Sequence, residues 1–166
     1  GEHGPHDLTL IVREVALDLA PLIADKSLDF DIHTEPTWVA AHDWMLRELS
    51  RNLLHNAIKA LPPGGRLTVT LTHGASEAVL RITDNGPGIA ADLQDRLFQP
   101  FATGNTPSVS GNSPQGFGLG LTICHEIAQV LGGNLRLDNR LVDGAVQGVD
   151  AVFTLPVSPR PDQPAL

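Results

Sequence analysis

The sequence predicts an α+β fold, a two-layer sandwich of a sheet and helices, rather than a doubly wound parallel sheet. Two observations carry this prediction. Segments with helical period and segments with strand-like alternation are mixed along the chain, and the strands expected at 67–72 and 78–83 are joined by a short polar turn, which is typical of a hairpin. The length of 166 residues and the apolar share of 42% suit one domain with one core.

Helices are expected where apolar residues recur every three or four positions. Asp43 is the expected N-cap of the second helix, the run Pro62–Gly65 stops that helix, and Gly132-Gly133 ends the last one. The expected helices span residues 6–24, 43–61, 90–97 and 119–131.

Strands are expected where apolar and polar residues alternate over a short run. They span residues 28–33, 37–41, 67–72, 78–83, 135–137 and 151–155. From Pro156 onward the chain is rich in proline, and we expect it to be disordered.

The composition excludes several classes of protein. The chain has 11 Lys and Arg against 19 Asp and Glu, a net charge of −8, which argues against non-specific nucleic-acid binding because a basic surface supplies most of that affinity. No window is long and apolar enough to span a membrane. The single cysteine, Cys124, forms no internal disulfide and is expected to be a small buried residue.

The helix expected at 43–61 has one polar face. Its simplest interpretation is the solvated side of an amphipathic helix. A functional interpretation is equally open, because two Asn side chains one turn apart offer oxygens that suit Mg²⁺, and a lysine suits phosphate. The polar residues that fall within one arc of this helix are Glu48, Asn52, His55, Asn56 and Lys59.

Asp84 follows the strand expected at 78–83 and continues the series of Leu80 and Ile82 on one face. A period of two therefore directs its carboxylate toward the core, where it needs hydrogen-bond donors. It is either the first residue of an Asx turn or a carboxylate at the floor of a pocket, where it would accept from an exocyclic amine such as that of adenine.

The run from Gly116 to Leu121 has the pattern G-x-G-x-G-L and opens a helix, whose free amides bind phosphate. No strand directly precedes this run, which counts against a dinucleotide-binding fingerprint. Residues 103–116 precede it and are rich in Gly, Ser, Pro and Asn, so we expect them to form a mobile lid that orders around a nucleotide.

Four of these runs, in this order, resemble the N, G1, F and G2 boxes of the ATP-binding domain of histidine kinases. That domain has the Bergerat fold, which is shared with gyrase, Hsp90 and MutL. The resemblance covers about residues 7–156 and implies a mixed sheet of about five strands packed on three helices. The runs are Asn52-Leu-Leu-His-Asn56-Ala, Asp84-Asn-Gly-Pro-Gly88, Phe98-Gln-Pro-Phe101 and Gly116-Phe-Gly-Leu-Gly120-Leu.

The resemblance implies roles for particular residues, with ATP and Mg²⁺ as cofactors. Asn52, Asn56 and Lys59 would be the catalytic set: Asn56 would coordinate Mg²⁺, whereas Asn52 and Lys59 would lie at the phosphates. Asp84 would bind the adenine amino group, and Thr154 would help hold a water beside it. Phe153, together with Ile89 and Leu119, would form apolar walls for adenine. The other implied nucleotide contacts are His55, Gly86, Gly88, Phe101, Gly116, Gly118 and Gly120.

The sequence departs from the family pattern at two places. No basic residue follows the F box within 101–104, which puts a phosphate contact from the lid in doubt. The connection 138–149 is longer than the usual short glycine turn, and we assign it no function from sequence.

Two other functions with the same fold stay open as alternatives. A gyrase-, Hsp90- or MutL-like ATPase places a water-activating Glu where Asn52 stands, and an asparagine cannot take that proton. An anti-sigma-type serine kinase would use a protein serine as the acceptor. None of the seven histidines is a convincing phosphoacceptor; His125-Glu126 resembles one only superficially.

The resemblance also implies a larger protein. We expect residues 1–6 to be the remnant of a linker, 7–156 to be the catalytic domain and 157–166 to be a disordered tail. The expected partners are a dimerisation and phosphoacceptor domain of the same protein, in a homodimer, and a response regulator downstream; no nucleic acid is expected. The expected location is the cytoplasmic side of an inner-membrane sensor.

Overall fold

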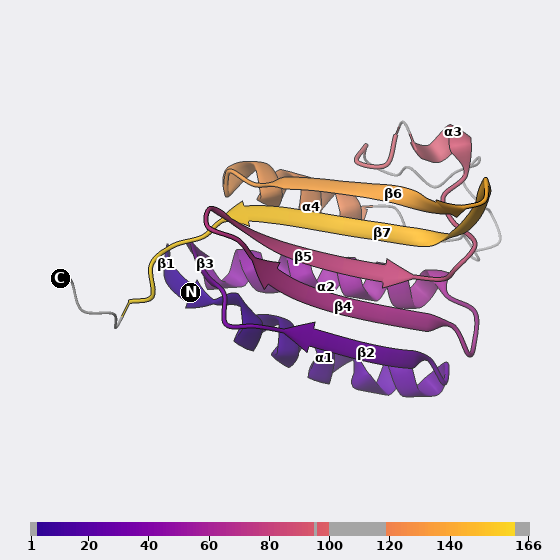
Figure 1. Cartoon of the computed structure of the whole chain (residues 1–166), viewed down its shortest axis with the longest axis horizontal. Coiled ribbons are helices and arrows are strands. Elements are labelled where there is room, and N and C mark those ends of the chain that lie inside the picture. Colours follow the sequence, from indigo (N-terminus) through magenta and orange to yellow (C-terminus); the bar gives the residue numbers. More distant parts are fainter. Residues whose placement is uncertain (1–2, 95, 100–118, 162–166) are drawn as a thin grey trace.

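A five-stranded mixed sheet forms one layer of the molecule in the computed structural model, which describes residues 3–94, 96–99 and 119–161 (Figure 1). Its strand order is β2-β4-β5-β7-β6; β2 runs parallel to β4, and every other neighbouring pair is antiparallel. The strands are β2 (Asp29–Thr34), β4 (Arg66–His73), β5 (Glu77–Asp84), β6 (Asn134–Val142) and β7 (Ala145–Pro156).

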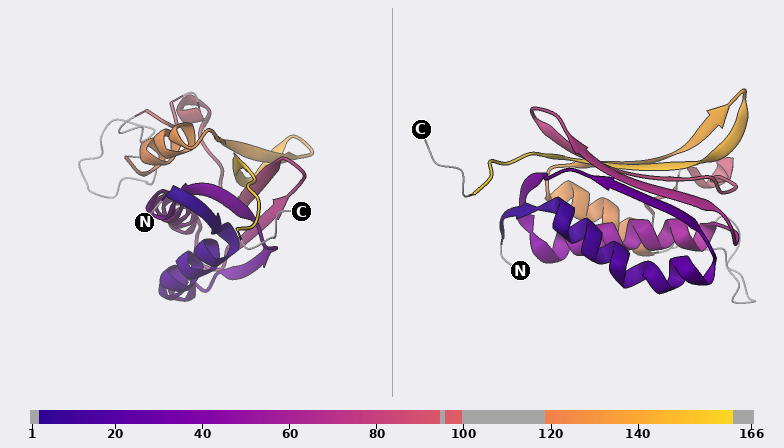
Figure 2. Two further views of the ribbon diagram at one scale, coloured as in Figure 1. Left: turned by 90° about the vertical axis from the view of Figure 1, so that its left-hand side faces the viewer. Right: turned by 60° about the horizontal axis from the view of Figure 1, so that its bottom comes forward.

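Three helices form the second layer and cover one face of this sheet (Figure 2). They are α1 (Leu8–Asp25), α2 (Asp43–Ala60) and α4 (Leu119–Val130), and α2 lies between the other two. The short helix α3 (Ala91–Gln94) lies at the end of the sheet where β6 turns into β7 (Figure 1). The expected α+β two-layer sandwich, with about five strands on three helices, is confirmed.

The core lies between the two layers because alternate strand residues and one stripe of each helix turn toward each other. Strands β4 and β5 show this most regularly, with burial that alternates residue by residue along most of each strand. Cys124 of α4 is fully buried there, as expected. Among the described residues, no helix is both long enough and apolar enough to span a membrane.

A second, two-stranded sheet was not expected. The strand β1 (His3–Asp7) pairs antiparallel with β3 (Trp38–His42), so residues assigned to a linker begin the fold. Asp7 then caps α1, since its Oδ1 accepts from the N–H groups of Thr9 (3.1 Å) and Thr37 (3.0 Å). Backbone pairing with β3 supplies what the Gly- and Pro-containing β1 segment lacks in strand propensity.

Three further expectations need correction. Asp43 is the first helical residue of α2 rather than its N-cap, which is His42, and Asp43 instead pairs with Arg47 at 2.6 Å. The tail does not leave the fold at Pro156, because the Ser158 N–H donates to the Trp38 carbonyl at 2.8 Å. The connection 138–149 is largely strand: β6 and β7 extend through it to a turn at 143–144.

Candidate functional site

The polar face of α2 meets the first turn of α4. Asn52 Nδ2 donates to the side chain and to the backbone carbonyl of Glu48, both at 2.8 Å. A Cβ on Gly120 would lie 3.2 Å from Asn52 Oδ1 and 3.9 Å from Asn56 Nδ2, so the backbone of α4 approaches both asparagines closely. This close approach brings two of the expected motifs together.

Asp84 ends β5 on the face that is turned toward the helices, and it is only 6% exposed. Its Oδ1 accepts from the backbone N–H of Gly86 at 2.9 Å and of Val149 at 3.2 Å. No described residue donates to Oδ2. Burial raises the pKa of Asp84 above its ordinary value, whereas the two backbone hydrogen bonds and the charge of Arg140 act to lower it. The result is a carboxylate with one oxygen held in place and one free to accept from a ligand.

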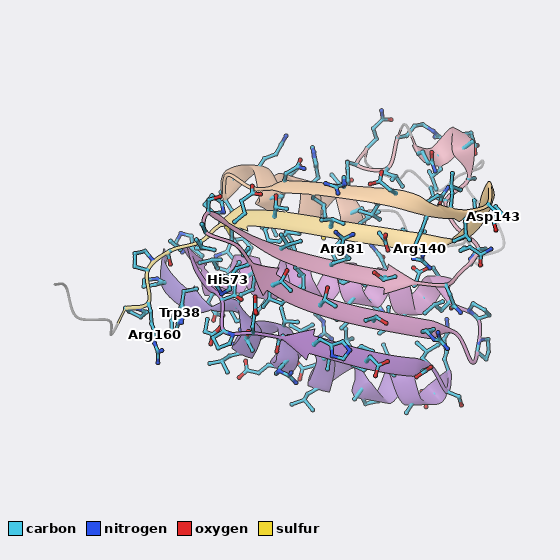
Figure 3. The ribbon with its side chains drawn as sticks, viewed as in Figure 1. Trp38, His73, Arg81, Arg140, Asp143 and Arg160 are labelled. Atoms are coloured by element: carbon cyan, nitrogen blue, oxygen red, sulfur yellow. The ribbon has the colours of Figure 1, made fainter. Side chains whose placement is uncertain are left out.

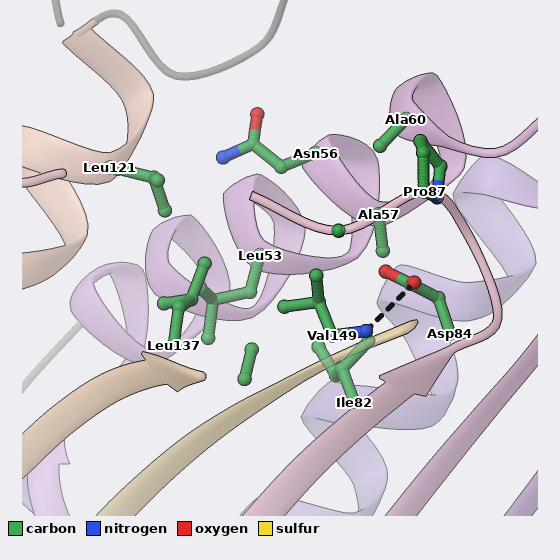
Figure 4. Close-up of a pocket in the computed structure, with 12 residues that line it drawn as sticks. Leu53, Asn56, Ala57, Ala60, Ile82, Asp84, Pro87, Leu121, Leu137 and Val149 are labelled. Atoms are coloured by element: carbon green, nitrogen blue, oxygen red, sulfur yellow. Dashed lines mark hydrogen bonds between the residues drawn. The ribbon is translucent and has the colours of Figure 1, made fainter. Parts of the chain in front are cut away.

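A pocket of about 470 Å³, including its open mouth, surrounds this carboxylate (Figure 4). Its walls are almost entirely apolar, and the exceptions are Asp84 at one end and the amide of Asn56 toward α4. Such a pocket suits a flat apolar ring with one polar edge group. It is lined by Leu53, Asn56, Ala57, Ala60, Ile82, Asp84, Pro87, Gly88, Leu121, Leu137, Val149 and Ala151.

Gly88 forms part of the pocket wall in a conformation that favours glycine, with φ of +93°. A Cβ there would lie 2.5 Å from Val146 Cγ1 and 2.9 Å from Asn139 Oδ1. Glycine therefore lets the loop after β5 pack directly against the β6–β7 hairpin.

Two basic or titratable side chains of α2 lie beside the pocket rather than in its wall. His55 is partly buried, and desolvation is the main reason that its pKa is lowered, with further contributions from the charges of Lys59 and Arg51. The Lys59 side chain is exposed. His55 therefore favours its neutral form, whereas the Lys59 side chain lies in solvent, one position before Ala60 of the pocket wall.

The structure corrects three of the expected site residues. Thr154 lies opposite Val79, five positions along β7 from Val149, so alternation places it on the other face of the sheet and about 17 Å from Asp84. Phe153 is buried in the core opposite Leu80 and does not line the pocket. Ile89 is buried behind the pocket wall, where its backbone pairs with Asn139.

The remaining expectations divide into two groups. Asn52, Asn56, Asp84, Gly86, Gly88 and Gly120 are brought together around the pocket. The expected lid 103–116, together with Phe101, Gly116 and Gly118, lies outside the described residues, as does the side chain of Leu119.

Several pocket residues were missed in the sequence because they reach the site only through pairing of distant strands. Val149 is the clearest case: it lies opposite Asp84 across β5 and β7 and donates its backbone N–H. Leu137 and Ala151 reach the same wall through the pairing of β6 with β7. The only signal in the sequence was the alternation of apolar residues within each strand.

The fold and the pocket together define an ATP-binding domain of the Bergerat type. Residues 43–159 match the model of the family described as "Histidine kinase-, DNA gyrase B-, and HSP90-like ATPase". This match covers more than half of the chain, and the protein belongs to this family.

Its relatives are sensor kinases. The chain is 34% identical over 137 residues to the sensor protein kinase PmrB of Pseudomonas aeruginosa, covering 82% of this chain and 28% of that protein. It is 35% identical over 160 residues to the adaptive-response sensory kinase SasA of Prochlorococcus marinus, covering 95% of this chain and 41% of that protein. The chain thus spans well under half of these relatives.

Solved structures of histidine kinases share the fold of this chain. A mycobacterial sensor histidine kinase, MprB, superposes with a TM-score of 0.78 at 30% identity and covers 96% of this chain and 100% of its own. The catalytic domain of the histidine kinase ThkA superposes with a TM-score of 0.80 at 28% identity, with the same coverage.

Proposed function

We propose that this chain is the catalytic ATP-binding domain of a sensor histidine kinase, and that it presents the γ-phosphate of Mg-ATP to a histidine on a separate dimerisation domain. The observation that carries the proposal is the Asp84 carboxylate at the end of an apolar pocket, with one oxygen held by two backbone N–H groups. Its free oxygen is suited to accept from the 6-amino group of adenine, while the apolar walls exclude water from the ring.

The residues near α4 fit a phosphate chain with its metal ion. Asn56 Nδ2 is buried and has no hydrogen-bond partner among the described residues, which is costly unless a ligand supplies an acceptor. The amide oxygen of Asn56 suits Mg²⁺, an ion that proteins hold with few side chains and largely through the phosphates of its nucleotide. No described group of three His, Cys, Asp or Glu side chains could hold a metal, so we assign the ion to Asn56 and the phosphates.

The other polar residues of α2 take supporting roles in this proposal. Lys59 contributes positive charge at the pocket mouth. Asn52, held by Glu48, lies beside the phosphates, and as an amide it cannot remove a proton from water. The domain therefore works by positioning ATP and offsetting its charge, as in other phosphoryl transfers.

The proposal extends to the whole protein of which this chain would be a part. The phosphoacceptor histidine would lie on a dimerisation domain of a homodimer, on the cytoplasmic side of a membrane sensor, and the phosphate would pass on to a response regulator. The sensor-kinase relatives support this assignment, and the relative ThkA has been solved in complex with a response regulator protein.

Calorimetric titration tests the proposal. The chain should bind the non-hydrolysable analogue AMP-PNP with Mg²⁺ in the micromolar-to-millimolar range and bind the guanine analogue much more weakly. Asp84→Asn should weaken the adenine nucleotide selectively. The matched control is Asp138→Asn, which removes an exposed carboxylate whose ion pair in the described part of the chain is with Arg136 on the outer face. Equal binding of both nucleotides by the unmodified chain would refute the proposed function.

A further inference from the structure

The β6–β7 hairpin lies against the loop 84–89, and the proposed function uses its Val149 N–H and the apolar side chains that it contributes to the pocket wall. Two of its side chains, Asn139 and Arg140, are neighbours in sequence and point to opposite faces of the sheet. Each of them binds the backbone of the loop that carries Asp84. The loop is therefore held from both faces of the sheet.

Asn139 holds the far end of the loop because its side-chain amide pairs with both backbone groups of Ile89, as a neighbouring strand would. Its Oδ1 accepts from the Ile89 N–H at 2.7 Å, and its Nδ2 donates to the Ile89 carbonyl at 2.9 Å. Both polar backbone groups of one loop residue are thus paired with one side chain. Because Ile89 directly follows Gly88, this pair of hydrogen bonds also fixes the pocket wall that Gly88 forms.

Arg140 holds the near end of the loop. Its Nη2 donates to the carbonyl oxygens of Asp84 and Gln147, both at 3.0 Å. Its Nη1 donates to Asp150 Oδ1 at 3.1 Å, which anchors the guanidinium on β7. Arg140 and Arg81 both lie over the outer face of the sheet, away from the helices and the pocket (Figure 3). Arg140 therefore supports Asp84 from behind, through its backbone.

Gly148 makes room for this contact. It lies opposite Arg140 in the pairing of β6 with β7 and has a φ of +147°. A Cβ at this position would overlap the Asp84 carbonyl oxygen and would lie 2.8 Å from Arg140 Nη2. A side chain at 148 would thus displace either the guanidinium or the loop, so the glycine and the arginine act together.

The loop has further attachments at its far end, where Gln94 Nε2 donates to the Ile89 carbonyl at 3.5 Å, and on the side of β4. Asn85 Oδ1 accepts from the Arg66 N–H at 2.7 Å, and the Asn85 N–H donates to the Arg66 carbonyl at 3.2 Å. This attachment joins the loop to the neighbouring strand of the sheet. Arg140 adds to the pairing of β5 with β7 in fixing the Asp84 carbonyl at this end of the loop.

We propose that Asn139 and Arg140 are positioning residues that give the pocket its selectivity for a 6-aminopurine, because they hold the loop 84–89 so that the free oxygen of Asp84 meets the exocyclic amine. This inference rests on the proposed function. Neither side chain is among the residues that line the pocket. They act on the orientation of the Asp84 carboxylate. A hydrogen bond weakens steeply with distance and angle, so a small shift of the free Asp84 oxygen weakens its bond to the amine.

The test compares two nucleotides that differ by the amine alone. The affinities for Mg-ATP and for the Mg complex of purine riboside triphosphate, which lacks the 6-amino group, are measured by calorimetry. In the Arg140→Met and Asn139→Ala variants, we expect the preference for ATP to fall about ten- to a hundredfold, which is what one hydrogen bond to a charged acceptor contributes. A general loss of stability would weaken both nucleotides alike and leave the preference unchanged.

Arg81→Met is the matched control. Arg81 also pairs with Asp150, at 3.8 Å, and is exposed on the same face, but it makes no hydrogen bond to the loop in the described structure. We expect it to keep the full preference for ATP. Thermal unfolding without nucleotide identifies any variant that does not fold, and the decision then rests on the variant that does.

The outcomes distinguish a failure of the proposed function from a failure of the positioning role of Asn139 and Arg140. An unmodified chain that binds neither nucleotide would refute the proposed function itself. An unmodified chain that prefers ATP, together with a folded Arg140→Met or Asn139→Ala variant that keeps the whole preference, would overturn the positioning role alone. An equal loss of preference in Arg81→Met would also overturn it, because the effect would then belong to Asp150.

Discussion

Asp84 and Val149 face each other across β5 and β7, and the Val149 N–H donates to Asp84 Oδ1 at 3.2 Å. The two residues are 65 positions apart in the chain. This contact orients the carboxylate, because it engages one oxygen and leaves the other for a ligand. The pocket therefore depends on the register between these two paired strands.

Asp84→Asn should weaken adenine-nucleotide binding without destabilising the domain. The asparagine can still accept from Gly86 and Val149, but it presents an amide donor to the adenine amine. Burial raises the pKa of Asp84 above its ordinary value of 3.8. The protonated carboxyl group therefore stabilises the fold fully at pH values below 3.8, and this contribution is lost as the pH rises through the raised pKa. At pH 7 the buried charge opposes folding, and the variant should unfold at an equal or higher temperature.

Thermal unfolding of the unmodified chain and of the Asp84→Asn variant, measured from about pH 5 to about pH 8, checks the sign of this effect. The advantage of the Asp84→Asn variant should shrink as pH falls toward the raised pKa. A variant that is strongly destabilised at pH 7 would show that the carboxylate is a structural residue.

Asn56→Ala should change the Mg²⁺ dependence of nucleotide binding more than the binding of metal-free nucleotide. The amide oxygen suits Mg²⁺, and Asn56 Nδ2 has no described partner to lose. Titrations of ADP with Mg²⁺ and with EDTA measure the difference. Equal weakening in both conditions would remove Asn56 from the metal site.

Lys26→Met should destabilise the domain by about 1–3 kcal/mol, because a charged donor to several carbonyls would be lost. Lys26 Nζ donates to the carbonyls of Ile58, Lys59 and Leu61 at 2.7–3.1 Å, and it thus caps the C-terminus of α2. Denaturant unfolding provides the measurement.

Lys59→Met is the contrasting variant, since the Lys59 side chain is exposed on the same last turn. It should leave stability nearly unchanged and weaken binding of the triphosphate. A large stability change in Lys59→Met, or none in Lys26→Met, would contradict this division between the two lysines.

The chain alone should neither label itself with the γ-phosphate nor turn over ATP steadily. No histidine is a convincing acceptor, and Asn52 cannot activate water. Incubation with γ-labelled ATP tests the first point, and phosphate release tests the second. Acid-labile phosphate on His125 would assign the acceptor role to α4, and steady hydrolysis would favour an ATPase of the gyrase type.

The local part of the site could be predicted from the sequence. Helical period was enough to place Asn52, Asn56 and Lys59 on the polar side of α2, and a period of two was enough to direct Asp84 toward the core. The order of the four motifs then indicated the family, because their spacing reflects a chain path that only this fold follows.

The incorrect expectation for Thr154 shows that strand register could not be predicted from the sequence. The family resemblance placed Thr154 beside Asp84, but the register of β5 with β7 brings Val149 there instead. The strand β1 was missed for a similar reason, since its hydrogen bonds come from β3, where His6 pairs with Val39, 33 positions further along the chain.

The sequence by itself determined most of the elements and the faces of their side chains, because helical and strand periods are set by local backbone geometry. It also indicated which residues are the candidates for the chemistry. Only the tertiary structure decided how these residues meet, since strand register joins positions that no local period relates. The contacts of Val149, Asn139 and Arg140 with the loop 84–89 arise from that register, and they hold a buried aspartate with one carboxylate oxygen free to accept a hydrogen bond.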